Sequence, residues 1–292
     1  MSVIEREQSV PSPGTLQESR EFFEENGYAV VRGLFDREEV IALREHYMTL
    51  RANGAYPGDM VGVEPTSDDP LKRFPRMIHM HRWDDTSLDW ALDSRLRDSL
   101  TALLGQAPFL GQTMIYFKPA GARGQALHQD NWYLKVAPGT CVAAWMALDP
   151  CTEANGCMQV IPGSHRWPLL CTKKADVTKS FTDVTVPIPD DVQPVSVTME
   201  AGDVLFFNGS LVHGSYPNTT TDQFRRSLIA HYVAGEAEQA TRFLNPLYRM
   251  DGTTFDITDS PGGGPCGVWV DQDGRQVVEL VGQLENKAAA SE

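Results

Sequence analysis

From residue 108 onward, Gly, Pro and Asn divide the sequence into short runs that are rich in β-branched and aromatic residues. Such residues favour strands, and each run is shorter than an ordinary helix. The runs cover residues 111–119, 126–134, 141–148, 157–162, 192–199, 203–209 and 225–233. Many short strands joined by turns predict a sandwich or a barrel rather than alternating strands and helices.

The N-terminal part of the chain predicts helices instead. Residues 15–26 fit a helix that ends at Gly27, a residue that tolerates the left-handed turn after a helix. Asp36 stands three residues before Glu39, which is the pattern of a capping box, and apolar residues at helical spacing continue to Leu50. A β-branched run at 28–34 predicts a strand between them. We therefore expect a mainly β protein with N-terminal helices.

The composition argues against several classes of protein. The 292 residues carry a formal net charge of −14, whereas nucleic acids and anionic membrane surfaces attract basic faces. The sequence has no apolar run long enough to cross a bilayer, and its first residues lack the apolar segment of a secretory signal. We therefore expect a cytoplasmic protein that binds neither nucleic acid nor membranes.

The five cysteines include no CxxC pair. This pattern argues against a zinc knuckle and against a secreted disulfide scaffold. It favours buried, reduced thiols at Cys141, Cys151, Cys157, Cys171 and Cys266.

Two histidines and an aspartate form a candidate metal site. His128 and Asp130 flank Gln129 within the run 126–134, and alternate residues of a strand share a face. His213 follows the run 203–209 and is a candidate third ligand. Two histidines and one carboxylate suit a non-haem Fe(II) that keeps open positions for a co-substrate and O₂.

Arg225 and Ser227 form a second candidate site on the run 225–233. They alternate onto one face of the expected strand, and a guanidinium beside a hydroxyl suits a carboxylate. Without the metal motif, a solvent-facing arginine would be the better interpretation of this pair.

In order and spacing, these motifs resemble the phytanoyl-CoA dioxygenase family of Fe(II)- and 2-oxoglutarate-dependent oxygenases. The resemblance extends over residues 20–235, and within the family the chain is most similar to bacterial small-molecule hydroxylases of the aminoethylphosphonate type. The motifs that carry it are FFEENGYAVVRGLF (22–35), His128-Gln129-Asp130, Ala144-Trp145, Asn155-Gly156-Cys157, Pro162-Gly163-Ser164-His165, Gly202-Asp203, His213-Gly214-Ser215 and Phe224-Arg225.

The resemblance implies a double-stranded β-helix, the jelly-roll fold shared with cupins, with N-terminal helices packed on it. It implies that His128, Asp130 and His213 bind Fe(II), and that Arg225, helped by Ser227, binds the distal (C5) carboxylate of 2-oxoglutarate. The residues expected to line the co-substrate pocket are Met114, Trp145 and Gln112, with Tyr116 on the same strand face. A single catalytic domain would span 15–285, with its β core at 108–235 and flexible tails at 1–14 and 286–292.

The activity implied by the resemblance is hydroxylation of an unactivated C–H bond in a small substrate, with O₂ as oxidant and with succinate and CO₂ as by-products. Asp130 favours hydroxylation over halogenation, because related halogenases leave the carboxylate position vacant for chloride. Desaturation or cyclisation by the same class of enzyme is one alternative. A cupin-type metalloenzyme that acts without 2-oxoglutarate, as an isomerase or an O₂-only dioxygenase, is another, and a non-catalytic binding module is the third.

A basic segment at residues 71–82 contains four Lys or Arg residues and no acid. It could bind an anionic substrate (a phosphonate, a carboxylate or a natural product) or the C1 carboxylate of 2-oxoglutarate, although a solvated loop is the alternative. The candidate substrate contacts are His79, His81 and Arg82 in this segment, together with Tyr116 and with Asn131, which follows Asp130. The sequence leaves the oligomeric state open.

Overall fold

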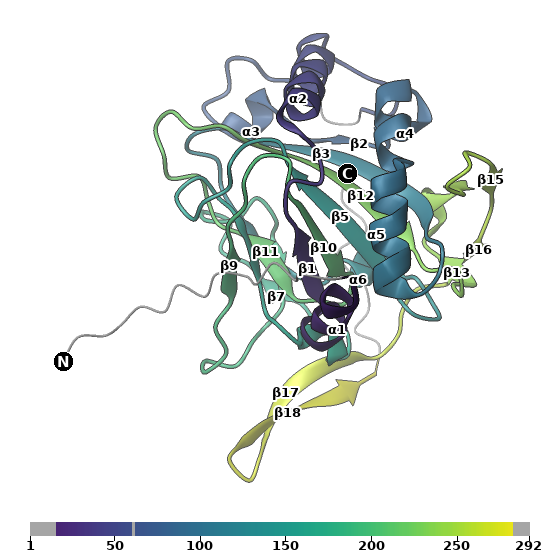
Figure 1. Cartoon of the computed structure of the whole chain (residues 1–292). Coiled ribbons are helices and arrows are strands. Elements are labelled where there is room, and N and C mark those ends of the chain that lie inside the picture. Colours follow the sequence, from purple (N-terminus) through teal and green to yellow (C-terminus); the bar gives the residue numbers. More distant parts are fainter. Residues whose placement is uncertain (1–15, 60–61, 283–292) are drawn as a thin grey trace.

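The computed structural model describes residues 16–59 and 62–282, which fold around two β-sheets (Figure 1). The major sheet has the order β1-β10-β5-β12-β3-β14-β15, with β2 paired to β3, and the minor sheet has the order β4-β11-β6-β9. The predicted mainly β, jelly-roll core is confirmed. The predicted tails at 1–14 and 286–292 lie outside the described residues.

The strands of the major sheet are β1 (Tyr28–Val31), β2 (Met77–Ile78), β3 (Phe109–Lys118), β5 (Cys141–Ala147), β10 (Val204–Asn208), β12 (Arg225–Val233), β14 (Leu247–Tyr248) and β15 (Thr254–Phe255). Those of the minor sheet are β4 (Gln125–His128), β6 (Met158–Val160), β9 (Val195–Val197) and β11 (His213–Ser215). Three two-stranded ribbons are formed by β7 (Lys173–Lys174) with β8 (Val184–Thr185), β13 (Gln239–Ala240) with β16 (Thr258–Asp259), and β17 (Cys266–Gln272) with β18 (Arg275–Val281).

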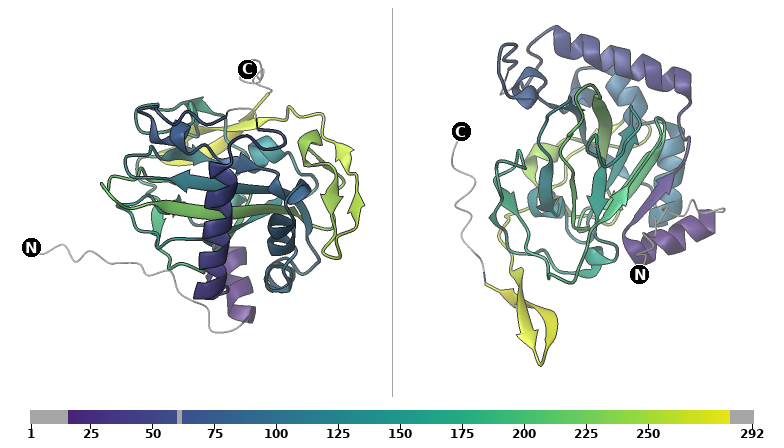
Figure 2. Two further views of the ribbon diagram at one scale, coloured as in Figure 1. Left: turned by 90° about the horizontal axis from the view of Figure 1, so that it is seen from above. Right: turned by 90° about the vertical axis from the view of Figure 1, so that its left-hand side faces the viewer.

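Helices cover the outer face of the major sheet (Figure 2). They are α1 (Leu16–Asn26), α2 (Arg37–Ala52), α4 (Asp85–Ala91) and α5 (Ser94–Leu104), and Met80 of the 3₁₀ turn η1 (Met80–Arg82) packs with them. The remaining short helices are α3 (Pro70–Arg73), α6 (Asn131–Leu134) and the 3₁₀ turns η2 (Ser164–Arg166) and η3 (Arg242–Leu244). The predicted capping box is confirmed, because Asp36 accepts a hydrogen bond from the Glu39 N–H and the Glu39 side chain accepts one from the Asp36 N–H. The predicted end of α1 is confirmed as well, with Gly27 at φ +81°.

The central strand β5 shows how the two sheets and the helices share one core. All seven of its residues are buried. Val142, Ala144 and Met146 belong to the apolar cluster that includes helix residues, whereas Trp145 belongs to the cluster that includes the minor sheet. Successive side chains point to opposite faces of a strand, so β5 contributes side chains to both clusters.

The prediction of reduced thiols is wrong for two of the five cysteines. Cys171 and Cys266 form a disulfide, whereas the other three are buried free thiols. The disulfide joins the segment after η2 to the first residue of β17, in a hairpin that projects from the core (Figure 1). The two cysteines lie 95 residues apart, which explains why no spacing pattern in the sequence indicated their pairing.

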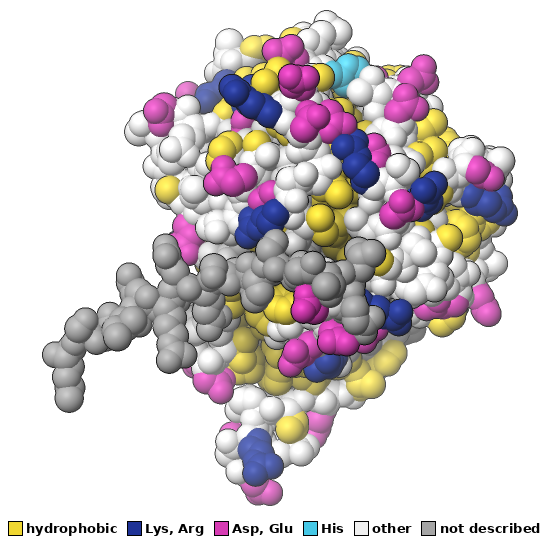
Figure 3. All heavy atoms as spheres, in the orientation of Figure 1, with side chains coloured by type: hydrophobic (Ala, Val, Ile, Leu, Met, Phe, Trp, Pro, Cys, Tyr) yellow, Lys and Arg dark blue, Asp and Glu magenta, His cyan; other side chains and the backbone are white. Residues whose placement is uncertain are grey.

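On the face shown in Figure 3, acidic and basic side chains are interspersed rather than gathered into one continuous patch. Among the described residues, no helix combines the length and the apolar character needed to span a membrane.

Candidate active site

The three candidate metal ligands meet between neighbouring strands of the minor sheet. His128 ends β4, His213 begins β11, and the two residues are paired directly across the strands. One ligand atom from each of His128, Asp130 and His213 lies within 4.8 Å of the others, and this is the one such group of three in the described part of the chain. The sequence motif therefore corresponds to a real cluster in space.

Backbone carbonyls orient both imidazoles. The Nδ1–H of His128 donates to the carbonyl of Ala126 at 2.9 Å, and the Nδ1–H of His213 donates to the carbonyl of Leu211 at 2.9 Å. These bonds leave a lone pair on each Nε2, and Asp130 Oδ1 lies 3.4 Å from the Nε2 of His128 and 3.6 Å from that of His213. The Gln125 amide nitrogen donates to the Nε2 of His128 at 3.0 Å. A hydrogen bond from the remote ring nitrogen is how proteins commonly fix a metal-binding histidine.

The ionisation states of the cluster suit a cation. Burial lowers the pKa of His213 to about 4, so that this imidazole is neutral at pH 7. Burial raises the pKa of the Asp130 carboxyl, but the neighbouring His213 and His231 outweigh that effect and hold its pKa well below the usual range. A neutral imidazole and an ionised carboxylate are the forms that bind metals.

The predicted strand 126–134 ends earlier than expected. β4 stops at His128, and Asp130 has helical backbone angles at the start of α6. The prediction that Gln129 points away from His128 and Asp130 nevertheless agrees with the structure. Its Oε1 accepts from the Leu170 N–H and its Nε2 donates to the Ser210 carbonyl, both at 2.8 Å.

A cavity of about 440 Å³ opens beside the three candidate ligands. Its wall includes the predicted residues Gln112, Met114, Tyr116, Trp145 and Arg225. Gln112, Met114 and Tyr116 share one face of β3 because they alternate along that strand. The structure thus brings these predicted residues to one cavity with the metal cluster.

Arg225 is buried without an acidic partner. It is 2% exposed, its Nη1 donates to Ser227 Oγ at 2.7 Å, and its guanidinium lies 5.2 Å from the centre of the Trp145 ring. Its Nε has no hydrogen-bond partner, and no carboxylate of the described residues forms an ion pair with it. A buried, unpaired guanidinium is costly unless an anion approaches it, so Arg225 is suited to an anionic ligand in the cavity.

Comparison with known proteins identifies the family. The family model for phytanoyl-CoA dioxygenase (PhyH) matches residues 23–227, which is well over half of the chain. The chain belongs to the phytanoyl-CoA dioxygenase family. Members of the PhyH family are oxygenases that depend on Fe(II), 2-oxoglutarate and O₂, and the chain is therefore an enzyme of this class.

Individual PhyH relatives are distant in sequence. Phytanoyl-CoA dioxygenase 1 of Oryza sativa subsp. japonica is 26% identical over 260 residues, which cover 78% of this chain and 92% of the relative. EctD from S. alaskensis, solved with bound Fe, is 26% identical with a TM-score of 0.59 and covers 74% of this chain and 75% of its own. The alpha-ketoglutarate-dependent epimerase SnoN from nogalamycin biosynthesis shares the fold at 22% identity, with a TM-score of 0.62 and coverage of 91% and 97%.

Four of the candidate substrate contacts of this PhyH chain are not among the residues that line the cavity. The Asn131 amide is used locally, since it donates to the Val136 carbonyl and accepts from the Val136 N–H. His81 is buried and its Nδ1 is hydrogen-bonded to the Thr113 hydroxyl, and the centre of the tilted His79 ring lies 5.8 Å from that of His81. Arg82 donates to two backbone carbonyls in the segment 243–245. Only Tyr116 of the five candidates faces the cavity.

The basic segment reaches the cavity through a different residue. Arg76 lines the cavity and donates to the Tyr116 hydroxyl at 3.3 Å, whereas Lys72 pairs with Glu64 and Arg73 donates to the Ser67 carbonyl. His79 lies at φ +56°, so the chain turns sharply there. The basic side chains of residues 71–82 therefore point in different directions. The number of charges in the sequence does not indicate which of these side chains reaches the cavity.

Two further cavity residues were not assigned a role from the sequence. His231 donates through Nε2 to Asp130 Oδ2 at 3.0 Å and so orients the candidate metal carboxylate. His231 and Arg225 lie an even number of residues apart on β12, so their side chains point to the same face of the strand. This spacing in the sequence indicated that His231 would face the cavity. Lys118 lines the same cavity, and nothing in its sequence context distinguishes it from an exposed lysine at the end of a strand.

Proposed function

We propose that His128, Asp130 and His213 bind Fe(II) at this centre. The support is that two oriented imidazoles and one ionised carboxylate converge within 4.8 Å, which is the donor set of the facial triad used by non-haem iron oxygenases. When bound, Fe(II) with 2-oxoglutarate and O₂ supplies the oxidation of a substrate C–H bond and releases succinate and CO₂. The task of the chain is to bind and orient the reactants and to keep water away.

Arg225 and Ser227 are proposed to bind the distal carboxylate of 2-oxoglutarate. The buried guanidinium offers an unpartnered Nε, and the Ser227 hydroxyl fixes its Nη1. The Trp145 ring lies against the guanidinium, and Met114 and Gln112 line the same cavity. The buried surroundings of the guanidinium strengthen a charge-assisted hydrogen bond to it.

The proposed reaction is hydroxylation of a small, anionic substrate by a single domain spanning 15–285. Arg76 and Tyr116 contribute polar groups to the cavity wall in addition to the metal cluster and Arg225. No carboxylate of the described residues pairs with Arg76 within 4.0 Å, so its guanidinium can receive the anionic group of a substrate or the C1 carboxylate of 2-oxoglutarate. Asp130 occupies the carboxylate position, which favours hydroxylation over halogenation.

Desaturation, cyclisation or epimerisation is the second candidate outcome, and the comparison with SnoN motivates it, since that protein is described as an epimerase. The observation that carries the class of reaction is the shared cavity of the His-Asp-His cluster and Arg225. Product analysis separates the outcomes, because hydroxylation adds an oxygen atom, desaturation and ring closure remove two hydrogen atoms, and epimerisation leaves the mass unchanged.

The test begins with Fe(II) reconstitution under anaerobic conditions, followed by 2-oxoglutarate and then O₂. We expect a visible charge-transfer band on 2-oxoglutarate addition and slow succinate release after O₂ even without substrate. Both signals should disappear in His128→Ala and Arg225→Met, whereas His165→Ala should keep them, because the ring of His165 contacts the Glu24 carbonyl. Wild-type protein that contains Fe(II) but neither binds 2-oxoglutarate nor converts it would contradict the proposal. A panel of candidate anions scored by accelerated succinate release then identifies the substrate.

A further inference from the structure

A second buried cation lies beside Arg225. Lys118 is the last residue of β3 and is the direct cross-strand partner of Arg225 on β12. Both residues are 2% exposed and both line the cavity. Residues directly opposite each other in an antiparallel pair project from the same face of the sheet, so the two cationic side chains enter the cavity together.

Neither cation has an acidic partner. The Lys118 ammonium donates to Ser215 Oγ at 2.8 Å and to the Tyr216 carbonyl at 2.6 Å, and these acceptors carry no net charge. Across residues 16–59 and 62–282, no Asp or Glu oxygen forms an ion pair with Lys118 or Arg225. Like charges placed directly opposite are unfavourable, and buried charges are normally paired. This arrangement therefore calls for an anion from outside the chain.

The ammonium has a donor left for such an anion. It carries three N–H groups, and Ser215 Oγ and the Tyr216 carbonyl accept from two of them. Burial, reinforced by the nearby Arg225 charge, holds the pKa of Lys118 well below its usual range. An anion that binds between the two residues would reverse this effect and favour the charged ammonium.

The surroundings of Lys118 accommodate its buried stem. Gly156 has φ +93°, and a Cβ atom at this position would lie 2.6 Å from Lys118 Cδ. The Asn155-Gly156 turn thus leaves the space that the lysine side chain occupies. The Asn155-Gly156-Cys157 motif, which does not contribute to the metal site or to the co-substrate site, therefore makes room for Lys118.

We propose that Lys118 and Arg225 together bind the distal carboxylate of 2-oxoglutarate, and that Lys118 makes the enzyme selective for 2-oxo acids that carry this second carboxylate. The inference rests on the proposed placement of that carboxylate at Arg225. Lys118 acts through binding and takes no part in the oxidation.

The test compares two ligands that differ only at the distal end. 2-Oxoglutarate and 2-oxopentanoate are titrated by calorimetry into the Fe(II) protein under anaerobic conditions. The variants are Lys118→Gln, which keeps a donor for Ser215 and Tyr216, and Lys118→Met, which removes it. Lys173→Gln on the exposed ribbon β7 is the matched control. We expect 2-oxoglutarate to bind about 10- to 100-fold more weakly to both Lys118 variants, as for the loss of a charge-assisted hydrogen bond. The dissociation constant of 2-oxopentanoate should change by less than about threefold.

Two results would overturn the inference. One is wild-type affinity for 2-oxoglutarate in Lys118→Gln, and the other is an equal loss of affinity for both ligands, which indicates a purely structural role. Arg225→Gln separates this inference from the proposed function. If Arg225→Gln binds 2-oxoglutarate normally, the carboxylate is not at Arg225. If only Arg225→Gln is impaired, the carboxylate is placed correctly and Lys118 does not bind it.

Discussion

The substitution Gln129→Leu tests how the two chain segments of the candidate metal site are held together. Gln129 is 1% exposed and lies between His128 and Asp130 in the sequence. Its amide bonds at 2.8 Å both to the Leu170 N–H and to the Ser210 carbonyl, in the segment that leads into His213. Leucine has nearly the same volume, so the substitution removes the hydrogen bonds with little change in packing.

The expected loss of stability follows from these two contacts. Each buried backbone group that is left without a partner costs about 1–3 kcal/mol. Two such groups lower the free energy of unfolding by about 2–5 kcal/mol, since a small rearrangement can admit water to one of them. Support behind metal ligands also tunes affinity, and its loss commonly weakens metal binding by about 10- to 100-fold.

Urea denaturation of the metal-free protein measures the first effect, and competition with a chelator measures the second. Gln193→Leu is the matched control, because Gln193 is exposed and donates only to the Asp190 carbonyl. Equal denaturation midpoints and equal metal affinity in Gln129→Leu and wild type would refute the reasoning. A loss of stability without a loss of metal affinity would show that Gln129 supports the fold but not the geometry of the ligands.

Three further substitutions test the assignments made above. Arg82→Ala should lower the free energy of unfolding by about 1–2 kcal/mol through its lost bonds to the segment 243–245, while calorimetry should find unchanged 2-oxoglutarate affinity; a large loss of affinity would return Arg82 to the site. Burial lowers the pKa of His81 from 6.5 to about 3, so below pH 6.5 the unfolded chain binds a proton that the folded chain does not, and acid destabilises the metal-free protein. His81→Gln should remove about 1.4 kcal/mol of this loss per pH unit in urea titrations between pH 6.5 and 4, and an unchanged slope would contradict the assignment. Gly156→Ala combines a strained φ of +93° with a clash against Lys118, so we expect both a lower melting temperature and weaker 2-oxoglutarate binding, and wild-type values for both would show that Lys118 can move aside.

The strands and the convergence of the three candidate metal ligands could be predicted from short sequence motifs and their order. Short β-rich runs indicate the strands, and the order of His128, Asp130 and His213 survives even though the strand between the first two ends early. That early end has a local cause. Asn131 exchanges two hydrogen bonds with Val136, and such side-chain bonds to backbone compete with the strand ladder.

Other features depend on contacts between distant segments. Lys118 and Arg225 lie directly opposite each other because of the register in which β3 pairs with β12. The sequence around either residue does not indicate that register. The same is true of the Cys171–Cys266 disulfide. In the basic segment, the backbone turns at His79. Arg76, before the turn, lines the cavity, whereas Arg82, after it, donates to the Asn245 carbonyl.

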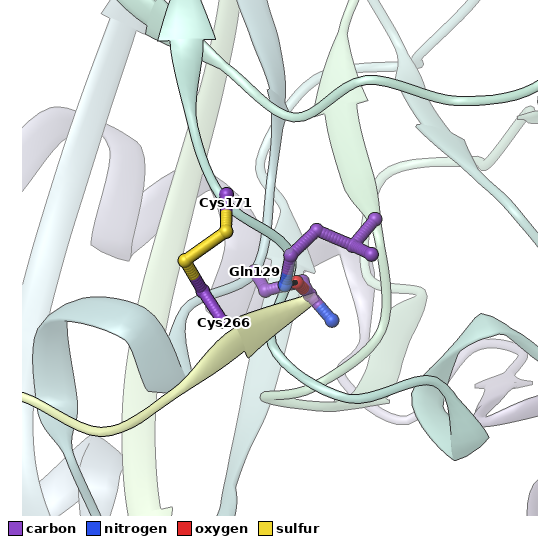
Figure 4. The surroundings of a disulfide bond; sticks show 4 residues. Gln129, Cys171 and Cys266 are labelled. Carbon is purple, nitrogen blue, oxygen red and sulfur yellow. Dashed lines mark hydrogen bonds between the residues drawn. A yellow bond between two sulfur atoms is a disulfide. The ribbon is translucent and has the colours of Figure 1, made fainter. Parts of the chain in front are cut away.

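The Cys171–Cys266 disulfide also changes the connectivity of the metal centre. Gln129, between the two upstream ligands, lies beside this disulfide (Figure 4). The bond closes a covalent ring that contains His213 and Arg225, while His128 and Asp130 stay outside it. A metal ion held by all three ligands would tie that ring to the chain upstream of it.

The covalent and the coordinate cross-link would then interleave along the sequence. Each shortens the loop that the other has to close, and the entropy of closing a loop falls as the loop shortens. Through Cys266, its first residue, the projecting hairpin β17–β18 is therefore joined covalently to the ring that carries one of the three candidate metal ligands.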